Sequence, residues 1–362
     1  MSEPEACRRL REFADNLVAD GSIIEGVQLS IAVPGRRFDI VAGRGGTGAA
    51  LTSAKRFRLY CAGKPLVALA ALRALHERRI PLGVAVGDAM RHSAWRLPAY
   101  AGEYTLGDLL SHRTCLIRPR GVEVGVETRP GAMRVAADRA PAVRGAAGYS
   151  EVTTWMLLSD AVEQMTGRPF ATEVRRTLDD LDLRNTTFGM STAEAAAVAG
   201  DTEVNVRRVG AQRVPMLWNR SVSSLTTFEP AFGGYGTAND LATFWRAVGC
   251  RSRYGGKVRP DALTEACRSM VHERREMILD AALGYECSFG MGAMVDLRQH
   301  WEGTSLSRRS VGHSGFMGVS FGLAQPEAQF ALGCNVVGIS DGENTAEFLR
   351  PTLINMALRV LG

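Results

Sequence analysis

The stretch FRLYCAGKP, residues 57–65, stands at the start of a strongly helical pattern. From residue 63 to residue 79, leucines recur at helical spacing with alanines between them, which predicts an α-helix. The start of a helix has free amide groups and the positive end of the helix dipole, and Lys64 follows Cys61 by one turn on the same face. Both features favour the thiolate form of a cysteine. Cys61 is therefore the candidate nucleophile of this protein.

Strand-like runs lie on both sides of this helix. The runs VQLSIAV (27–33) and RFDIVA (37–42) are separated by Pro34-Gly35, which predicts a hairpin. Helical patterns are found near both ends of the sequence, at 1–21 and 345–360. The last third contains short runs rich in β-forming residues and broken by glycines, at 289–295, 310–313, 317–324 and 329–337.

The segment between residues 79 and 245 has a mainly helical and loop-like pattern, including an amphipathic helix at 152–166 closed by Gly167 and Pro169. Because strands stand before and after it, we predict an α+β fold: an antiparallel sheet flanked by N- and C-terminal helices, with a large, mainly helical insertion. We expect residues 1–60 and 245–362 to form an α/β lobe and 61–244 a mainly helical lobe, with the active site in the cleft between them.

The composition is that of an ordinary globular protein, with 46% hydrophobic and 22% charged residues in 362. The net charge of +5 comes from scattered arginines without a basic tract, so nucleic acid is not an expected partner. The arginine-rich stretch 113–144 is either a solvated loop or a site for an anionic group. We expect no membrane span and no signal peptide, and hence a cytoplasmic protein.

The seven cysteines are widely spaced and form no C-x-x-C pair. Neither a zinc site nor a disulfide framework is expected from this pattern, and no cofactor or metal is predicted. Small buried apolar side chains account for most of the cysteines. Cys61 is the exception because of its position beside Lys64.

Two further segments complete a known order of motifs. Tyr149-Ser150-Glu151 and His313-Ser314-Gly315 follow the 57–65 stretch at wide spacing. Together they resemble the Ser-x-x-Lys, Tyr-x-Asn and Lys- or His-Thr-Gly motifs of the penicillin-binding-protein and serine β-lactamase superfamily, in its class C β-lactamase, esterase and D-peptidase branch. The resemblance covers roughly residues 25–360 and includes supporting stretches at 105–112, 165–170 and 233–241. It implies the β-lactamase/transpeptidase-like fold, with Cys61 in place of the nucleophilic serine.

The resemblance also implies roles for individual residues. Lys64 and Tyr149 would relay the proton of the nucleophile, although Lys64 can instead stay charged beside a thiolate while Tyr149 or His313 protonates the leaving group. The backbone amides of Cys61 and Phe316 would form the oxyanion hole.

Around this machinery, Gly315 would let the strand edge approach the acyl group. Ser314 and His313 would bind the polar end of the substrate. Glu151 stands where relatives have an amide side chain, so it places a carboxylate where a β-lactam amide would be held. Penicillin hydrolysis is therefore disfavoured.

The expected reaction is acyl transfer through a Cys61 thioester, in small-molecule or natural-product metabolism. The partners would be an ester, thioester or carrier-bound acyl donor and an amine acceptor, which Glu151 would bind or deprotonate. A hydrolase of the same fold (thioesterase, esterase or amidase) is the alternative. A third possibility is a binding protein that has lost catalysis, but the retained Lys64, Tyr149 and His313 argue against it.

Overall fold

The computed structural model describes the greater part of the chain. Most of the arginine-rich stretch 113–144, and Cys250, lie outside the described residues. The described residues are 2–19, 22–93, 97–117, 146–203, 205–209, 212–215, 225–249, 263, 266–267, 270, 276–300, 305–340 and 345–361.

An 8-stranded antiparallel sheet forms the centre of the fold, in the order β2-β1-β13-β12-β11-β10-β9-β8. Strands from the two ends of the sequence meet inside it, because β1 pairs with β13. This confirms the predicted sheet. Its strands are β1 (Gly26–Val33), β2 (Arg36–Gly43), β8 (Ile278–Leu279), β9 (Glu286–Phe289), β10 (Met294–Val295), β11 (Val311–Ser314), β12 (Ser320–Gln325) and β13 (Phe330–Val337).

The predicted hairpin joins β1 to β2, and Gly35 takes the positive φ (71°) that its turn requires. The strand-like run over 289–295, which its glycines interrupt, consists of two strands with a turn between them. Strand β9 ends at Phe289, and the chain turns before β10 starts at Met294. The turn contains Gly292 with φ 82°, a backbone conformation that interrupts an extended strand.

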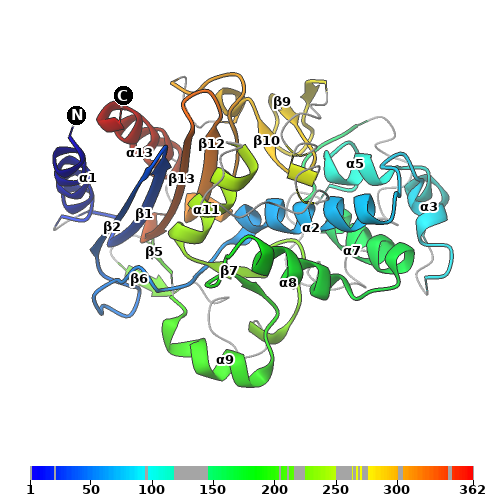
Figure 1. Cartoon of the computed structure of the whole chain (residues 1–362), viewed down its shortest axis with the longest axis horizontal. Coiled ribbons are helices and arrows are strands. Elements are labelled where there is room, and N and C mark those ends of the chain that lie inside the picture. The colour runs from blue at the N-terminus through cyan, green and yellow to red at the C-terminus, as the bar shows by residue number, and fades with distance from the viewer. Residues whose placement is uncertain are drawn as a thin grey trace.

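Helices cover both faces of the sheet (Figure 1). Ile31 and Leu332 share a core with α1 (Glu3–Leu17) and α13 (Thr345–Leu361), whereas Ala32 and Ala331, on the opposite face, share a core with α11 (Ala238–Gly249). The approach of α11 is close. A Cβ atom on Gly333 would lie 2.2 Å from the carbonyl oxygen of Ala238, so only glycine fits there.

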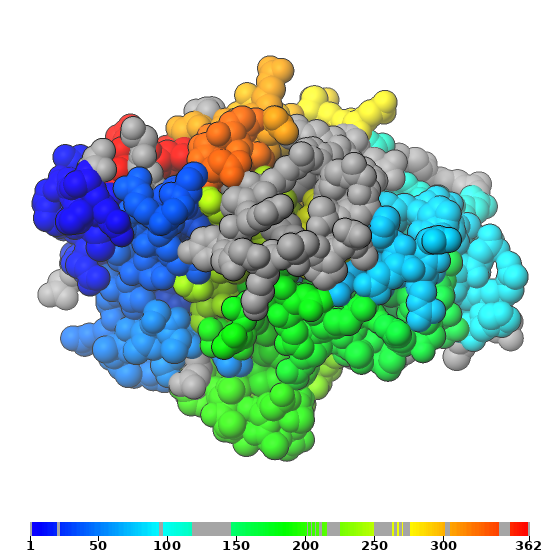
Figure 2. Space-filling model, viewed as in Figure 1, coloured from blue at the N-terminus to red at the C-terminus, as the bar shows by residue number. Residues whose placement is uncertain are grey.

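A second group of helices extends away from the sheet, and within it α2 packs against α7 and α8 (Figure 1). Helix α7 ends as predicted, with Gly167 in the left-handed conformation at φ 68°. In the space-filling view, α1 and the region of α3 lie at opposite ends of the long axis (Figure 2). The helices of this group are α2 (Lys64–Glu77), α3 (Val86–Ala89), α4 (Ala99–Gly102), α5 (Leu106–Leu110), α7 (Thr153–Thr166), α8 (Phe170–Asp180) and α9 (Thr192–Val198).

The segment between 79 and 245 also contains strands, which the helical interpretation missed. Two small sheets have the orders β3-β7-β4 and β14-β5-β6. Strands of two to four residues are too short to show an alternating pattern in the sequence. The strands of the two small sheets are β3 (Phe57–Arg58), β4 (Thr187–Phe188), β5 (Val206–Val209), β6 (Gln212–Pro215), β7 (Gly234–Gly236) and β14 (Ile339–Ser340). Of these, β4 to β7 lie between residues 79 and 245, whereas β3 and β14 lie outside that segment.

Short 3-10 turns complete the described elements: η1 (Tyr60–Gly63), η2 (Ala199–Asp201), η3 (Leu297–Gln299) and η4 (Phe316–Gly318). The division into lobes 1–60 with 245–362 and 61–244 stays a prediction, and α11 crosses residue 244 while packing on the sheet. None of the helices in the described ranges combines the length and apolar character needed to cross a bilayer.

Candidate active site

Cys61 lies in η1, the single turn that runs directly into α2. The segment before it is fixed by β3, which pairs with β7, and by the amide of Leu59, which donates to the carbonyl of Gly234 over 2.8 Å. Tyr60 has a positive φ of 50°, a rare conformation for a non-glycine residue. The α-helix itself starts at Lys64, so Cys61 precedes it by a turn rather than opening it. The side chain of Cys61 is half-buried.

Lys64 and Cys61 are in contact. The Nζ atom of Lys64 donates to the Sγ atom of Cys61 over 3.0 Å. Lys64 is completely buried, and its Nζ atom lies 5.0 Å from the ring centroid of Tyr149 and 5.9 Å from that of Trp155. Aromatic faces at these distances attract a cation. The ammonium group of Lys64 is thus held between the sulfur and two aromatic rings.

Tyr149 belongs to a segment that polar contacts fix on both sides. Its amide donates to Oδ2 of Asp280 over 2.8 Å, and the next amide, of Ser150, donates to Nδ1 of His112 over 3.0 Å. Asp280 also accepts from the amides of Ala282 and Leu283. These contacts connect the Tyr149 segment to the turn after β8 and to the end of α5.

The hydroxyl of Tyr149 is buried and makes no hydrogen bond with any described residue. Burial raises its pKa well above the usual value, and the nearby Cys61 sulfur and the charge of Glu151 raise it further. Tyr149 is therefore a neutral hydroxyl at neutral pH. Because an unsatisfied buried polar atom is costly, its presence beside a candidate nucleophile is a feature of a functional site.

His313 stands at the end of β11, with its ring centroid 5.9 Å from that of Tyr149. Its Nδ1 atom lies 3.0 Å from the carbonyl oxygen of Ser314, which only accepts, so Nδ1 carries the proton and Nε2 is an acceptor. Nε2 is buried with no partner among the described residues. Burial, followed by the charge of Lys64, lowers the pKa of His313 to about 3, so the ring is neutral.

The turn after His313 lies beside η1. A Cβ atom on Gly315 would be only 2.5 Å from the carbonyl oxygen of Leu59, so glycine is required for this approach. Ser314 is half-buried, and the 43% exposed Phe316 places its ring 5.9 Å from that of Tyr60. The segments that carry the amides of Cys61 and Phe316 are therefore neighbours, while their role as an oxyanion hole stays a prediction.

Glu151 is half-buried, and its charge acts on Tyr149, as the raised pKa of that hydroxyl shows. The structure thus brings Cys61, Lys64, Tyr149 and His313 together, with Glu151 nearby. Among the described residues, no group of three histidine, cysteine, aspartate or glutamate side chains is arranged to hold a metal ion.

The sequence-based interpretation missed several buried groups around these residues. His112, the last residue of the supporting stretch 105–112, lies with its ring centroid 4.5 Å from that of Tyr149, and burial lowers its pKa well below the usual value. Asp280 fixes the backbone of Tyr149. Glu229 accepts from the amides of Ala231 and Phe232, and its pKa, raised by burial, is affected by the charge of Lys64. Spacing along the chain carries no signal for these contacts.

Comparisons with known proteins agree with this geometry. Three solved structures are similar over almost their full length: a penicillin-binding-protein homologue from Caulobacter crescentus (20% identity, TM-score 0.76, 98% of each chain), a family VIII carboxylesterase (18%, 0.76, 98% of this chain and 97% of that one) and EstCE1, a hydrolase with promiscuous acyltransferase activity (18%, 0.71, 99% of each). At these identities the likeness shows the fold. A search of curated proteins finds no significant match.

The match to a family model decides the assignment. It extends over residues 14–339, which is most of the chain and includes every segment of the site described above. The segments of the site follow one another along the chain in the order of the three motifs: β3 with η1 and α2 come first, then the Tyr149 segment, and then β11. The chain therefore belongs to the Beta-lactamase family, with a β-lactamase/transpeptidase-like fold and a cysteine at the position where the resemblance places the nucleophilic serine.

Proposed function

We propose that this protein is an acyltransferase that carries the acyl group as a thioester on Cys61. The observation that supports it most directly is the 3.0 Å contact between the buried ammonium of Lys64 and the half-buried sulfur of Cys61. A cation this close stabilises a thiolate, which is the nucleophilic form of cysteine. A site that had lost catalysis would have no chemical reason to bury a lysine against its sulfur.

The surroundings also support a division of the proton-transfer roles. Tyr149 keeps its proton at neutral pH because its pKa is raised, so it is the group that can donate to the leaving group. His313 has the opposite character, since its neutral ring presents an unpartnered acceptor at Nε2. We therefore assign proton donation to Tyr149, and to His313 the acceptance of a hydrogen bond from the substrate or the incoming nucleophile.

Transfer to an amine is proposed over hydrolysis for a chemical reason. A thioester lacks the resonance stabilisation of an ordinary ester and reacts more readily with amines than with water. The carboxylate of Glu151 lies near Tyr149, where it can bind an ammonium or take a proton from an attacking amine. EstCE1, which has this fold, is described as a hydrolase with promiscuous acyltransferase activity. The donor would be an ester, thioester or carrier-bound acyl group.

A hydrolase is the second candidate, since a family VIII carboxylesterase and a D-amino acid amidase from Ochrobactrum anthropi share the fold. The two candidates differ in the fate of one intermediate. Both require an acyl group on Cys61, but a hydrolase passes it to water and a transferase to the amine.

The test has two stages. The protein is first incubated with p-nitrophenyl acetate and with an acetyl thioester, and the adduct is located by peptide mass spectrometry. We expect acetyl on Cys61 and none on Cys7, the matched control, which is also half-buried but lies on α1. The acyl-enzyme is then mixed with a panel of amines at millimolar concentration, and amide and acetate are measured.

Each outcome decides a part of the proposal. If neither donor gives an adduct on Cys61, a binding protein without catalysis would be the remaining candidate. An adduct that goes to acetate with every amine would establish a hydrolase. Cys61→Ser is expected to form an acyl-enzyme at least about 10-fold more slowly, because the site activates a thiolate and need not deprotonate an alcohol. An equally fast serine variant would show that the sulfur is incidental.

A further inference from the structure

The contact between Cys61 and Lys64 places together two atoms that can form a covalent bond after oxidation. The sulfur belongs to a half-buried side chain, so a small oxidant can reach it. The nitrogen 3.0 Å away belongs to a side chain with no exposed surface. The buried hydroxyl of Tyr149, which has no hydrogen-bond partner among the described residues, also acts on this sulfur.

We propose that Cys61 and Lys64 form a reversible sulfur–nitrogen bond when Cys61 is oxidised by a hydroperoxide. In the first step the thiolate attacks a peroxide oxygen; an S–O bond forms, the O–O bond breaks, and the released hydroxide takes a proton to become water. In the second step the amine of Lys64 attacks the sulfur of the sulfenic acid; the S–N bond forms, the S–O bond breaks, and hydroxide leaves with a proton from nitrogen. Thiol, amine and hydrogen peroxide thus give a sulfenamide and two waters.

The first step prepares the second. A thiolate is a counter-charge for the ammonium of Lys64, whereas a sulfenic acid is neutral. The hydroxide released from the peroxide in the first step is a strong base that can take the proton of the neighbouring Lys64, which leaves the nucleophilic amine. The carboxylate of Glu229, which accepts from the amides of Ala231 and Phe232, is a further negative group that acts on Lys64.

The chain geometry allows the bond to close without moving the backbone far. Cys61 lies in η1 and Lys64 is the first residue of α2, so the two side chains stand one turn apart on a continuous helical segment. The flexible four-carbon stem of a lysine can bring its nitrogen onto the sulfur. The bond would also shield the sulfur from further oxidation to the sulfinic and sulfonic acids, which are not readily reversed.

The bond would switch off the site, because it occupies both the nucleophile and its charged partner. A reducing thiol would restore it by attacking the sulfur, so that the S–N bond breaks, the amine takes a proton and a mixed disulfide forms. A second thiol would then release Cys61. A serine at this position undergoes none of these steps, so the switch would depend on the cysteine of this chain.

The test uses the whole protein and hydrogen peroxide. After oxidation, blocking of free thiols and trypsin digestion, both residues remain in one peptide, 59–73, because Arg58 and Arg73 are cleavage sites and the Lys64-Pro65 bond resists trypsin. We expect this peptide to lose two hydrogens in mass and to recover the reduced mass after dithiothreitol. The internal control is peptide 1–8 with Cys7, which should gain oxygen atoms instead.

Other masses would overturn the proposal: two or three added oxygens on peptide 59–73, a disulfide to another cysteine, or a peptide that stays reduced while Cys7 is oxidised. A net gain of one oxygen with loss of two hydrogens would place an oxygen between sulfur and nitrogen and would reject the direct bond. In Lys64→Met the loss of two hydrogens should vanish and added oxygens should replace it. If that variant does not fold, labelling of free amines in the denatured, oxidised wild-type protein decides instead, because a bond to Lys64 blocks its amine whereas a sulfenamide to a backbone nitrogen leaves it free.

This inference uses the same sulfur as the proposed function but can fail separately from it. If Cys61 is acylated by the donors but gains only oxygen atoms after peroxide, the proposed function stands and the sulfur–nitrogen bond is rejected. If the peptide loses two hydrogens reversibly after peroxide but Cys61 is never acylated, the sulfur–nitrogen bond stands and the acyltransferase is rejected.

Discussion

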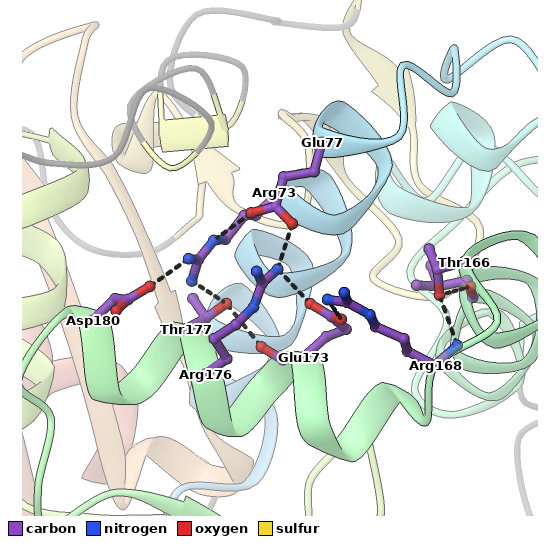
Figure 3. A network of polar contacts seen from close by, with 9 residues as sticks. Arg73, Glu77, Thr166, Arg168, Glu173, Arg176, Thr177 and Asp180 are labelled. Atoms are coloured by element: carbon purple, nitrogen blue, oxygen red, sulfur yellow. Dashed lines mark hydrogen bonds and ion pairs between the residues drawn. The ribbon is translucent and has the colours of Figure 1, made fainter.

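The two ends of helix α2 bury polar groups in opposite ways. At its N-terminal end, Lys64 contacts the sulfur of Cys61, while the hydroxyl of Tyr149 and the Nε2 atoms of His112 and His313 have no hydrogen-bond partner among the described residues. At its C-terminal end, the buried Arg73 is one member of an extended ion-pair network (Figure 3). The helix therefore has one end with unsatisfied polar atoms and one with well-paired charges.

The network at the C-terminal end connects α2 to α8. Arg73 pairs with Glu77 over 3.2 Å and with Asp180, and Arg176 reaches Glu77 and Glu173, each over 2.6 Å (Figure 3). Burial opposes ionisation of Glu77, but hydrogen bonds and charges from Arg176 and Arg73 still lower its pKa. Each of these carboxylates is paired with an arginine, although the Nε atom of Arg176 has no hydrogen-bond partner among the described residues.

The comparison indicates which charged residues serve stability and which serve chemistry. Unsatisfied buried polar atoms reduce stability, so a folded protein keeps them where function requires them. Paired charges between helices serve to fix the helices. Changes at the N-terminal end of α2 should therefore affect rate, and changes at the C-terminal end should affect the free energy of unfolding.

The largest expected effect is on rate, from Tyr149→Phe. Loss of the proton donor should slow acylation of Cys61 by about 100-fold or more. The free energy of unfolding should stay the same or rise slightly, because the substitution removes an unsatisfied buried hydroxyl. The measurement is the single-turnover rate with p-nitrophenyl acetate. The matched control is Tyr104→Phe, whose hydroxyl is paired with the Sγ atom of Cys115 at 3.2 Å and which should acylate normally. Near-normal acylation by Tyr149→Phe would remove this residue from the mechanism.

The next effect is on stability, from Arg73→Met. This variant removes the Arg73 partner of Asp180 and leaves Glu77 paired with Arg176, and we expect a loss of about 2 kcal/mol, less than for a fully buried pair because Glu77 and Asp180 are partly exposed. Urea unfolding measures it, and the acylation rate should stay unchanged. The control is Arg91→Met, which breaks an exposed pair with Asp88 and should cost under about 0.5 kcal/mol. Equal losses in the two variants would contradict the role of the network.

A pH change should act on the buried histidines around the site. Burial lowers the pKa of His300 to about 4, so this ring is neutral when folded but takes a proton at a higher pH when unfolded. The contribution of the neutral His300 ring to the free energy of unfolding is complete above the usual histidine pKa of about 6.5. It is lost as the pH falls toward the pKa of His300 in the folded protein. We expect His300 to account for about 1 to 2 kcal/mol of the stability lost between pH 7 and pH 5.

The check is urea unfolding at both pH values for wild type and His300→Gln. The variant should lose less stability on acidification than wild type. His76→Gln is the control, since His76 is exposed on α2 and its replacement should leave the pH dependence unaltered. The same acid sensitivity in all three proteins would assign the pH effect to other groups.

The smallest expected effect is on product choice, from Glu151→Gln. Removing the carboxylate that would bind or deprotonate the amine should lower the ratio of amide to acetate by about 3-fold or more, while acylation of Cys61 continues. The measurement is partitioning of the acyl-enzyme, with Glu286→Gln on the exposed side of β9 as control. An unchanged ratio, together with dominant hydrolysis, would favour the hydrolase.

Local patterns in the sequence predicted the parts of the fold that depend on neighbouring residues. The hairpin at Pro34-Gly35, helix α2 and the Gly167 end of α7 all follow from such patterns, and the structure confirms them. Motif order brought Cys61, Tyr149 and His313 into one hypothesis, and the structure places them together.

The rest depends on contacts that no local pattern encodes. Asp280 accepts from an amide 131 positions away, and His112 from one 38 positions away. Strands β4 and β7 are too short to alternate visibly. The ion pairs of Arg73 follow the same rule, since Asp180 becomes its neighbour only when α8 packs on α2.

The pairing of β1 with β13 has a consequence for how the chain folds during synthesis. Val27 lies opposite Val336, so the inner edge of the β1–β2 hairpin is covered only after the chain has been synthesised as far as β13. Until then, β1 exposes unpaired backbone groups that can pair with another nascent chain. Contacts so distant in sequence also slow folding, because a long loop must close before they form. Chaperone demand should therefore be greatest before the C-terminal strands emerge.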